Sequence, residues 1–295
     1  MQTTNHTRGI TKKSGRNMTQ AIWTGVLLVC GLITVIMFLP PYCFTILLIL
    51  CAVLGVHELR FAYAQQHIHL PFFPLYLSSI LIPTGTYLVN NHWLGLLLSF
   101  TLTTLITLIT TPFTIKNTTK TPLTTNSITQ HLTTTIFIEL YVSLLSSLLI
   151  IALFHPHYQP QLMMLLFIPA CSDTGGLFFG MNFGKHKLSP HISPKKSYEG
   201  LLGSIIFAII GTLIFYTIFY THTLLSTSWW QPFLYGLSIA LAGTYGDLSI
   251  SMIKRDLSIK DLGNLLKGHG GILDRVDSIL LSVPVALLLF SWFTL

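Results

Sequence analysis

Long apolar runs alternate with short polar segments along almost all of the 295 residues. A helix that crosses a membrane needs about 20 mostly apolar residues, and about 17 is a practical minimum. The pattern therefore predicts an all-α polytopic membrane protein with about nine transmembrane helices. The runs that meet or nearly meet the requirement are 20–39, 42–59, 72–90, 93–111, 136–154, 161–180, 199–220, 231–253 and 276–294.

The range 161–180 has the weakest apolar pattern, because Pro169, Asp173, Gly175 and Gly176 interrupt it. An interrupted helix is tolerated at membrane depth only where its backbone lines a cavity inside the protein. We therefore expect a broken helix here.

The composition excludes soluble classes of protein. Hydrophobic residues make up 51% of the chain and charged residues 8%, whereas a soluble domain has about 25% charged residues. The 16 basic and 9 acidic side chains are too few to cover a water-facing surface. Cytosolic enzymes, secreted disulfide scaffolds and disordered chains are thus excluded.

The basic residues predict the orientation. A net charge of +7 is compatible with nucleic-acid binding, but in a membrane protein a basic excess more often marks the cytoplasmic segments. If the N-terminus is cytoplasmic, the inner segments contain all 16 lysine and arginine residues. The positive-inside rule therefore predicts a cytoplasmic N-terminus, an external C-terminus and no nucleic-acid partner. The inner segments are 1–19, 60–71, 112–135, 181–198 and 254–275.

This topology divides the chain into four parts. We expect a basic cytoplasmic N-terminal segment (1–19), N-terminal transmembrane helices (20–111), a threonine-rich cytoplasmic linker (112–135) and a C-terminal transmembrane catalytic region (136–295). The catalytic region has its cytoplasmic loops at 181–198 and 254–275. The first apolar run is long enough to span a membrane, so we expect no cleavable signal peptide.

Acidic residues within spans are costly and mark functional sites by default. Seven of the nine lie between positions 171 and 278: Asp173, Glu199, Asp247, Asp256, Asp261, Asp274 and Asp277. Of the other two, Glu58 is two residues from Arg60, and we interpret it as a local charge partner. Glu139 is compatible with a structural hydrogen-bonding role and with a place in a polar cavity, and the sequence leaves both open.

The spacing of the C-terminal acids predicts a shared site. On a helix, Asp247, Ser251 and Lys254 lie on one face at i, i+4 and i+7, and Asp274 and Asp277 share a face at i and i+3. Two helix ends would then bring carboxylates together at the cytoplasmic side, below a cationic loop. Carboxylates hold Mg²⁺, which commonly keeps few protein ligands and adds substrate phosphate oxygens. The pattern thus favours a magnesium-bound polyphosphate over a solvated ion-pair loop.

Two further features support a phosphate site. Gly268, Gly270 and Gly271 would let backbone amides approach a phosphate closely. Ser193, Lys195 and Lys196 precede the helix that is expected to start near position 199, on the same cytoplasmic side. Taken alone, such a basic loop more often sets topology or attracts anionic lipid.

These residues also form the motifs of a known family. The first motif is Ser251-x-Ile253-Lys254-Arg255-x4-Lys260-Asp261-x-Gly263-x2-Leu266-x2-His269-Gly270-Gly271-Ile272-x-Asp274-Arg275-Val276-Asp277. It resembles the signature of the phosphatidate cytidylyltransferases, or CDP-diacylglycerol synthases. The run Ser193-Pro194-Lys195-Lys196-Ser197-x-Glu199-Gly200 resembles their second motif, and the resemblance covers about residues 171–285. Two positions depart from it: Ile250, where the family usually has an acid, and Lys267, where it has Pro or Gly.

The resemblance implies transfer of the cytidylyl group of CTP to phosphatidate, giving CDP-diacylglycerol and pyrophosphate for phospholipid biosynthesis. It implies Mg²⁺ held by Asp247 and Asp274 with Asp277 close by, and it leaves a second, monovalent cation open. The implied catalytic residues are Asp247, Asp274, Lys196, Lys254 and Arg275, and the implied substrate-binding residues are Ser193, Lys195, Arg255, Lys260, Asp261, Gly268, His269, Gly270 and Gly271. The expected partners are CTP, phosphatidate, membrane lipid and a second copy in a homodimer. The expected location is the bacterial inner membrane, as a multi-pass protein.

Two other functions remain as alternatives. A CTP-dependent lipid kinase would bind the same nucleotide but transfer its terminal phosphate. An ion-coupled transporter would also place acids in broken helices, but no internal repeat is visible, so the inverted repeats of many transporters find no support.

Overall fold

The computed structural model describes residues 30–66, 68–118, 125–155, 157–219, 229–263 and 271–293. These residues form helices and one pair of short antiparallel strands, and residues 30–38 are also helical. The elements are α2 (Pro41–Gln65), α3 (Phe72–Leu88), α4 (His92–Thr118), α5 (Thr125–Ile138), the π-helical turn η1 (Glu139–Leu144), α6 (Leu145–Ala152), α7 (Tyr158–Phe183), β1 (Lys187–Ser189), β2 (Ser193–Ser197), α8 (Tyr198–Phe219), α9 (Gln231–Asp256) and α10 (Leu273–Phe293).

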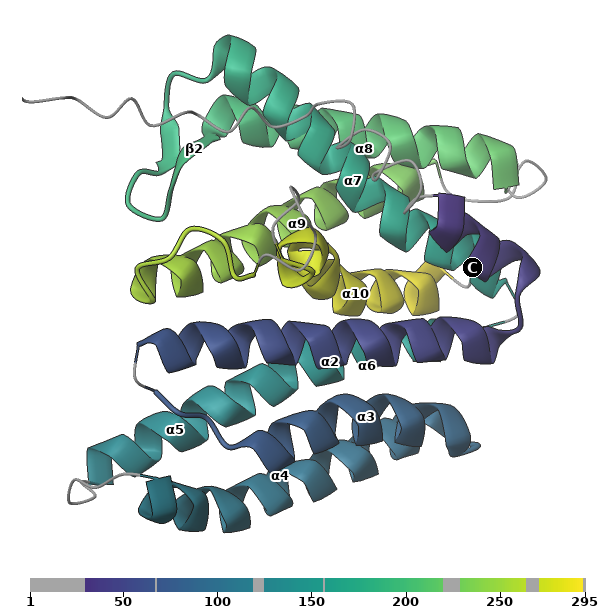
Figure 1. Ribbon diagram of the computed structural model, residues 1–295. Coiled ribbons are helices and arrows are strands. Elements are labelled where there is room, and N and C mark those ends of the chain that lie inside the picture. Colours follow the sequence, from purple (N-terminus) through teal and green to yellow (C-terminus); the bar gives the residue numbers. More distant parts are fainter. Residues whose placement is uncertain are drawn as a thin grey trace, which may run out of the picture.

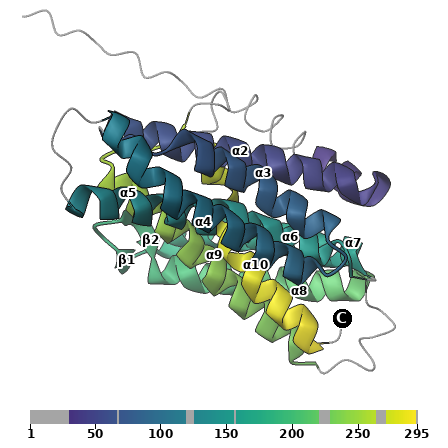
Figure 2. The same ribbon diagram turned by 90° about the horizontal axis from the view of Figure 1, so that it is seen from below.

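The helices pack side by side in successive layers (Figure 1). Helices α7 and α8 form one outer layer, α9 and α10 lie next to it, α2 and α6 follow, and α3, α4 and α5 form the other outer layer. The strands β1 and β2 lie at one end of this bundle, and the C-terminal end of α10 lies toward the other (Figure 2). The bundle thus has one end that combines the hairpin with the end of α9.

Six helices in the described part of the chain are long and apolar enough to cross a membrane. They are Pro41–Gln65, His92–Thr114, Ile128–Ala152, Tyr158–Phe183, Tyr198–Phe219 and Leu273–Phe293, and the apolar helix Phe72–Leu88 is shorter. Large apolar side chains such as Leu98, Ile109 and Leu202 are exposed on these helices, as expected of surfaces that face lipid. An all-α membrane fold is therefore supported.

The nine predicted ranges each overlap a helix, and the first of them does so only through residues 30–38. Helix α9 is not among the six long apolar helices, because its second half carries Asp247, Lys254, Arg255 and Asp256. The number of spans therefore stays a prediction.

The expected break in 161–180 is wrong, because α7 is a continuous helix of 26 residues that includes Pro169. The glycines in this range serve close packing instead. A Cβ at Gly175 would collide with the carbonyl of Gly203 on α8, and one at Gly176 would collide with Ser204 Oγ. Small residues let membrane helices approach closely, so these positions hold α7 against α8.

Part of the threonine-rich range 112–135 is helical, although the sequence predicts a linker there. Helix α4 continues to Thr118 and α5 begins at Thr125, so helices enter the predicted linker range 112–135 from both sides. Threonine hydroxyls bond to carbonyls one turn back, as in Thr110 Oγ1 to Ile106 O at 2.7 Å and Thr133 Oγ1 to Thr129 O at 2.9 Å. These two hydroxyl groups thus find their acceptors within their own helices.

The segment 181–198, expected as a loop, contains the β1–β2 hairpin, in which Lys187 pairs with Ser197. Glu199 at the start of α8 accepts hydrogen bonds from the backbone N–H of Lys185 and of His186, both at 3.2 Å. The His186 ring lies 2.7 Å from the same carboxylate. The hairpin is therefore anchored to the first turn of α8.

Candidate active site

A pocket of about 720 Å³ lies between α7, the hairpin, α8, α9 and α10. Four carboxylates and five cationic side chains line it: Asp173, Asp247, Asp274, Asp277, Lys187, Lys195, Lys196, Lys254 and Arg275. Apolar side chains of Leu177, Met181, Leu188 and Leu201 complete part of the wall. The pocket thus joins a highly charged region to an apolar one.

Asp247 links α9 to the hairpin. Ser251 Oγ donates to Asp247 Oδ1 at 3.3 Å, which confirms that these two residues share a helix face. Lys196 Nζ lies 2.9 Å from Asp247 Oδ2 and donates to the carbonyl of Thr244 at 3.0 Å. The structure therefore joins a lysine of one sequence motif to a carboxylate of the other.

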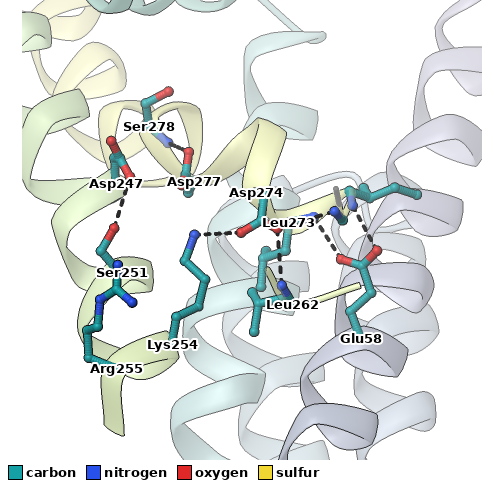
Figure 3. A network of polar contacts seen from close by, with 12 residues as sticks. Glu58, Asp247, Ser251, Lys254, Arg255, Leu262, Leu273, Asp274, Asp277 and Ser278 are labelled. Atoms are coloured by element: carbon teal, nitrogen blue, oxygen red, sulfur yellow. Dashed lines mark hydrogen bonds and ion pairs between the residues drawn. The ribbon is translucent and has the colours of Figure 1, made fainter. Parts of the chain in front are cut away.

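Asp274 forms a second ion pair, with 2.8 Å between its Oδ1 and Lys254 Nζ (Figure 3). The side chains of Lys254 and Asp274 are only 14% and 9% exposed. The other oxygen, Oδ2, accepts from the backbone N–H of Leu262 and of Gly271, both at 3.2 Å. Both carboxylate oxygens are therefore occupied by protein donors.

Asp277 and Asp173 bring two more carboxylates to the pocket. Asp277 is buried and its Oδ1 accepts from the backbone N–H of Ser278 at 2.8 Å. Ser278 Oγ donates to Asp173 Oδ2 on α7 at 3.1 Å. Asp277 interacts electrostatically with both Asp247 and Asp173, so acids from three helices lie close together.

The approach of α9 and α10 depends on a glycine. A Cβ at Gly246 would collide with the backbone carbonyl of Asp277. Only glycine permits this contact, and it places Asp247, the next residue on α9, beside Asp277.

Asp173 was not among the predicted site residues. The sequence did carry a signal for it, since an acid within an apolar range is a functional candidate by its position.

The other predicted residues divide into four groups. Ser193, Lys195 and Arg275 line the pocket. Arg255 does not: its Nε donates to the carbonyl of Ile192 at 3.0 Å, which holds the hairpin turn. Lys260 and Asp261 are exposed and are not part of the lining. Of the predicted glycine loop, Gly271 contacts Asp274, while Gly268, His269 and Gly270 lie outside the described residues.

The interpretation of Glu58 as a charge partner of Arg60 is wrong. Glu58 is 2% exposed and accepts from the backbone N–H of Ile272 at 2.8 Å and of Leu273 at 3.0 Å. Arg60 Nε instead donates to the carbonyl of Leu70 at 3.3 Å. Residues two positions apart on a helix face different directions, so Glu58 and Arg60 have different partners despite their closeness in sequence.

Glu139 belongs to a different environment. It is fully buried on η1 and accepts a hydrogen bond from Thr107 Oγ1 on α4. It is not among the residues that line the pocket. Of the two roles left open by the sequence, the structure supports the hydrogen-bonding one.

Residues 19–293 match the family described as the cytidylyltransferase family, and the chain belongs to this family. Among curated relatives, the phosphatidate cytidylyltransferase of Mycobacterium leprae is 40% identical over 132 residues, which are 43% of this chain and 39% of the relative. That of Haemophilus influenzae is 38% identical over 141 residues, 47% of each protein. That of Staphylococcus epidermidis is 39% identical over 114 residues, 39% of this chain and 42% of the relative. The matched segment thus spans less than half the length of these relatives.

Proposed function

We propose that this protein transfers the cytidylyl group of CTP to phosphatidate, giving CDP-diacylglycerol and pyrophosphate. The observation that carries the proposal is the pocket, where five cationic and four acidic side chains from the hairpin, α7, α9 and α10 converge. Membership of the cytidylyltransferase family and the names of the relatives agree with it.

The apolar part of the pocket supports a lipid substrate. Leu177 and Met181 on α7 are 64% and 75% exposed, and both line the pocket. The acyl chains of phosphatidate would lie along such side chains, while its phosphate reaches the charged region. A water-soluble acceptor of the cytidylyl group would not need these apolar side chains.

The reaction requires a phosphate oxygen of phosphatidate to attack the α-phosphorus of CTP, as the bond from this phosphorus to the bridging oxygen breaks and pyrophosphate leaves. The attacking phosphate is already largely anionic near neutral pH, so no strong general base is needed. Positioning and charge neutralisation dominate such transfers. The positioning and the positive charge would come from three side chains that line the pocket, Lys196, Lys254 and Arg275.

Mg²⁺ is part of the proposal, with Asp247, Asp274 and Asp277 as its carboxylates. Within the described residues, no three His, Cys, Asp or Glu side chains are arranged to hold a metal ion by themselves. Mg²⁺ is commonly bound through one or two carboxylates together with substrate phosphates, so the pair of Asp247 and Asp277 fits it by donor chemistry. A divalent cation there would offset their mutual repulsion and neutralise the triphosphate. Asp274 would bind the Mg²⁺ ion only after the Lys254 ammonium group moves away from its Oδ1.

We further propose nine spans with a cytoplasmic N-terminus and an external C-terminus, in the inner membrane of a bacterium. The hairpin and the end of α9 lie at the same end of the bundle, which supports a common cytoplasmic side for 181–198 and 254–275 (Figure 1). The bacterial origin of the relatives supports the choice of membrane. Homodimer formation stays a prediction, checked by the mass of the purified protein in detergent.

The test is an assay of purified protein with phosphatidate, Mg²⁺ and CTP labelled at either the α- or the γ-phosphate. Cytidylyl transfer puts the α-label into lipid and the γ-label into pyrophosphate. A γ-label in lipid would instead identify a CTP-dependent lipid kinase. Absence of both labels from lipid would contradict both the cytidylyltransferase and the lipid kinase function, and the transporter would remain as the alternative.

A further inference from the structure

Helix α2 contacts the polypeptide on both sides of positions 264–270. At the end of α9, the Gln66 Nε2 atom donates to the carbonyl of Leu257 at 2.7 Å. At the start of α10, Glu58 accepts from the backbone N–H of Ile272 and of Leu273 (Figure 3). Gln66 directly follows the last residue of α2, and Glu58 lies about 12 Å before it along the helix axis, at 1.5 Å per residue. One helix of the N-terminal half therefore holds both helix ends that carry the candidate site.

Two glycines confirm how closely the chain packs on Glu58. A Cβ at Gly263 would meet Glu58 Oε1 at 2.8 Å, and one at Gly271 would meet Oε2 at 2.5 Å. Both distances are too short for real contacts, so neither position accepts a side chain without a shift. The described residues on either side of 264–270 thus converge on a single carboxylate.

Glu58 is linked to the pocket through Asp274. The two carboxylates divide four neighbouring backbone donors: Asp274 takes those of Leu262 and Gly271, and Glu58 takes those of Ile272 and Leu273. Leu273 directly precedes Asp274, so a shift of its amide moves the first turn of α10. Glu58 itself does not line the pocket, so any effect on the reaction must pass through this turn.

Stabilisation of a helix end alone does not account for this arrangement. A carboxylate near a helix N-terminus is stabilising, and an exposed residue in the first turn of α10 would supply the same interaction. Burying a carboxylate costs free energy unless it is well paired. Glu58 is nevertheless buried, and it comes from a position more than 200 residues earlier in the chain. Its place fits a requirement for an exact orientation of α10 relative to α2.

We propose that Glu58 is a positioning residue for the cytidylyl transfer, which fixes the first turn of α10 and thereby the orientation of Asp274 and Arg275. The inference rests on the proposed function. Glu58 holds backbone donors and does not touch substrate. Its loss should therefore lower the rate of the chemical step more than the affinity for substrate.

The test uses the full chain with Glu58→Gln, and Glu139→Gln serves as the matched control. Both changes neutralise a buried acid that does not line the pocket, but of the two only Glu58 accepts from backbone donors at the start of α10. Glutamine keeps the size and one acceptor oxygen, while its NH₂ group cannot accept from a backbone N–H. We expect kcat to fall roughly tenfold or more, as for a misplaced catalytic group, with the KM for phosphatidate within about twofold. Glu139→Gln should stay within about twofold of the native kcat.

Thermal unfolding separates positioning from general stability. We expect both glutamine variants to unfold at similar temperatures. A native-like kcat in Glu58→Gln, or equal losses of kcat in both variants, would overturn the inference. If the native protein itself transfers no label from α-labelled CTP to lipid, the proposed function fails first.

A second variant leaves the carboxylate in place. Gly263→Ala pushes a methyl group against Glu58 Oε1, so we expect kcat to fall in a folded protein. In a Glu58→Ala background the methyl group has room, and Gly263→Ala should add little further loss. Additive losses of kcat would show that the two positions act independently, against the inference.

Discussion

Lys196 and Asp247 form an ion pair, with 2.9 Å between Nζ and Oδ2, although they belong to separate sequence motifs on β2 and α9. Both side chains remain partly exposed to the pocket, at 22% and 35%. The ammonium group is therefore held inside the pocket before any substrate binds. A phosphate that enters the pocket meets a cation whose position is already set by α9.

Lys196→Ala should lower turnover at limiting substrate roughly ten- to a hundredfold. A hydrogen bond to a charged group contributes about 1.5–3 kcal/mol, and about 1.4 kcal/mol corresponds to one factor of ten. The measurement is kcat/KM for CTP. Lys116→Ala is the control, because Lys116 lies on α4, which packs on α3, α5 and α6, away from the pocket. Equal losses of kcat/KM in both variants would mean that the basic residues of the hairpin set the membrane orientation and do not bind substrate.

Asp247→Asn and Asp274→Asn should each abolish turnover, because metal and phosphate binding depend on their charge. Their stability should differ. Asp274→Asn leaves the Lys254 ammonium buried without its charge partner, and such losses destabilise strongly. Asp247 is more exposed, so its variant should unfold close to the native temperature. Near-normal turnover of either variant at ordinary Mg²⁺ would contradict the assignment.

The sequence predicts the helices well, because lipid imposes a minimum apolar length that can be counted. It also predicts the contact of Asp247 with Ser251, since that depends only on helix periodicity. It does not predict the Glu58 contact with α10 or the continuity of α7. These depend on packing between helices that are distant in the sequence, as at Gly175 against Gly203. The sequence marks Asp173 only as an acid within an apolar range, because its place in the pocket depends on the packing of α7 against α10.

Asp173→Asn should reduce activity about tenfold and raise the Mg²⁺ concentration needed for half-maximal turnover. The reason is that it removes one of three acids that lie close together and attract a cation. Ser278→Ala is the control: it removes the hydrogen bond to Asp173 and keeps the carboxylate. A larger loss in Ser278→Ala than in Asp173→Asn would show that the hydrogen bond matters and the charge does not.

Gly175→Ala should lower the unfolding temperature, because a methyl group there collides with the Gly203 carbonyl and Phe207 on α8. Overpacking of this kind typically costs about 1–3 kcal/mol. Gly31→Ala is the matched control, since a Cβ there meets nothing within 4 Å. It should be neutral or slightly stabilising, as expected for alanine in a helix. Thermal unfolding in detergent measures both, and equal midpoints would contradict the close packing of α7 on α8.

Cysteine labelling in a variant without the four native cysteines tests the topology. His191 in the hairpin turn and Lys260 after α9 are exposed. The hairpin and the C-terminal end of α9 lie at one end of the bundle (Figure 1). Asn91, also exposed, lies in the turn between α3 and α4, which is predicted to be external. His191→Cys and Lys260→Cys should react with a membrane-impermeant reagent only after the membrane is opened, and Asn91→Cys in intact cells. Labelling of position 260 in intact cells would place the pocket on the external side, away from cytosolic CTP, and would overturn both the nine-span topology and the proposed function.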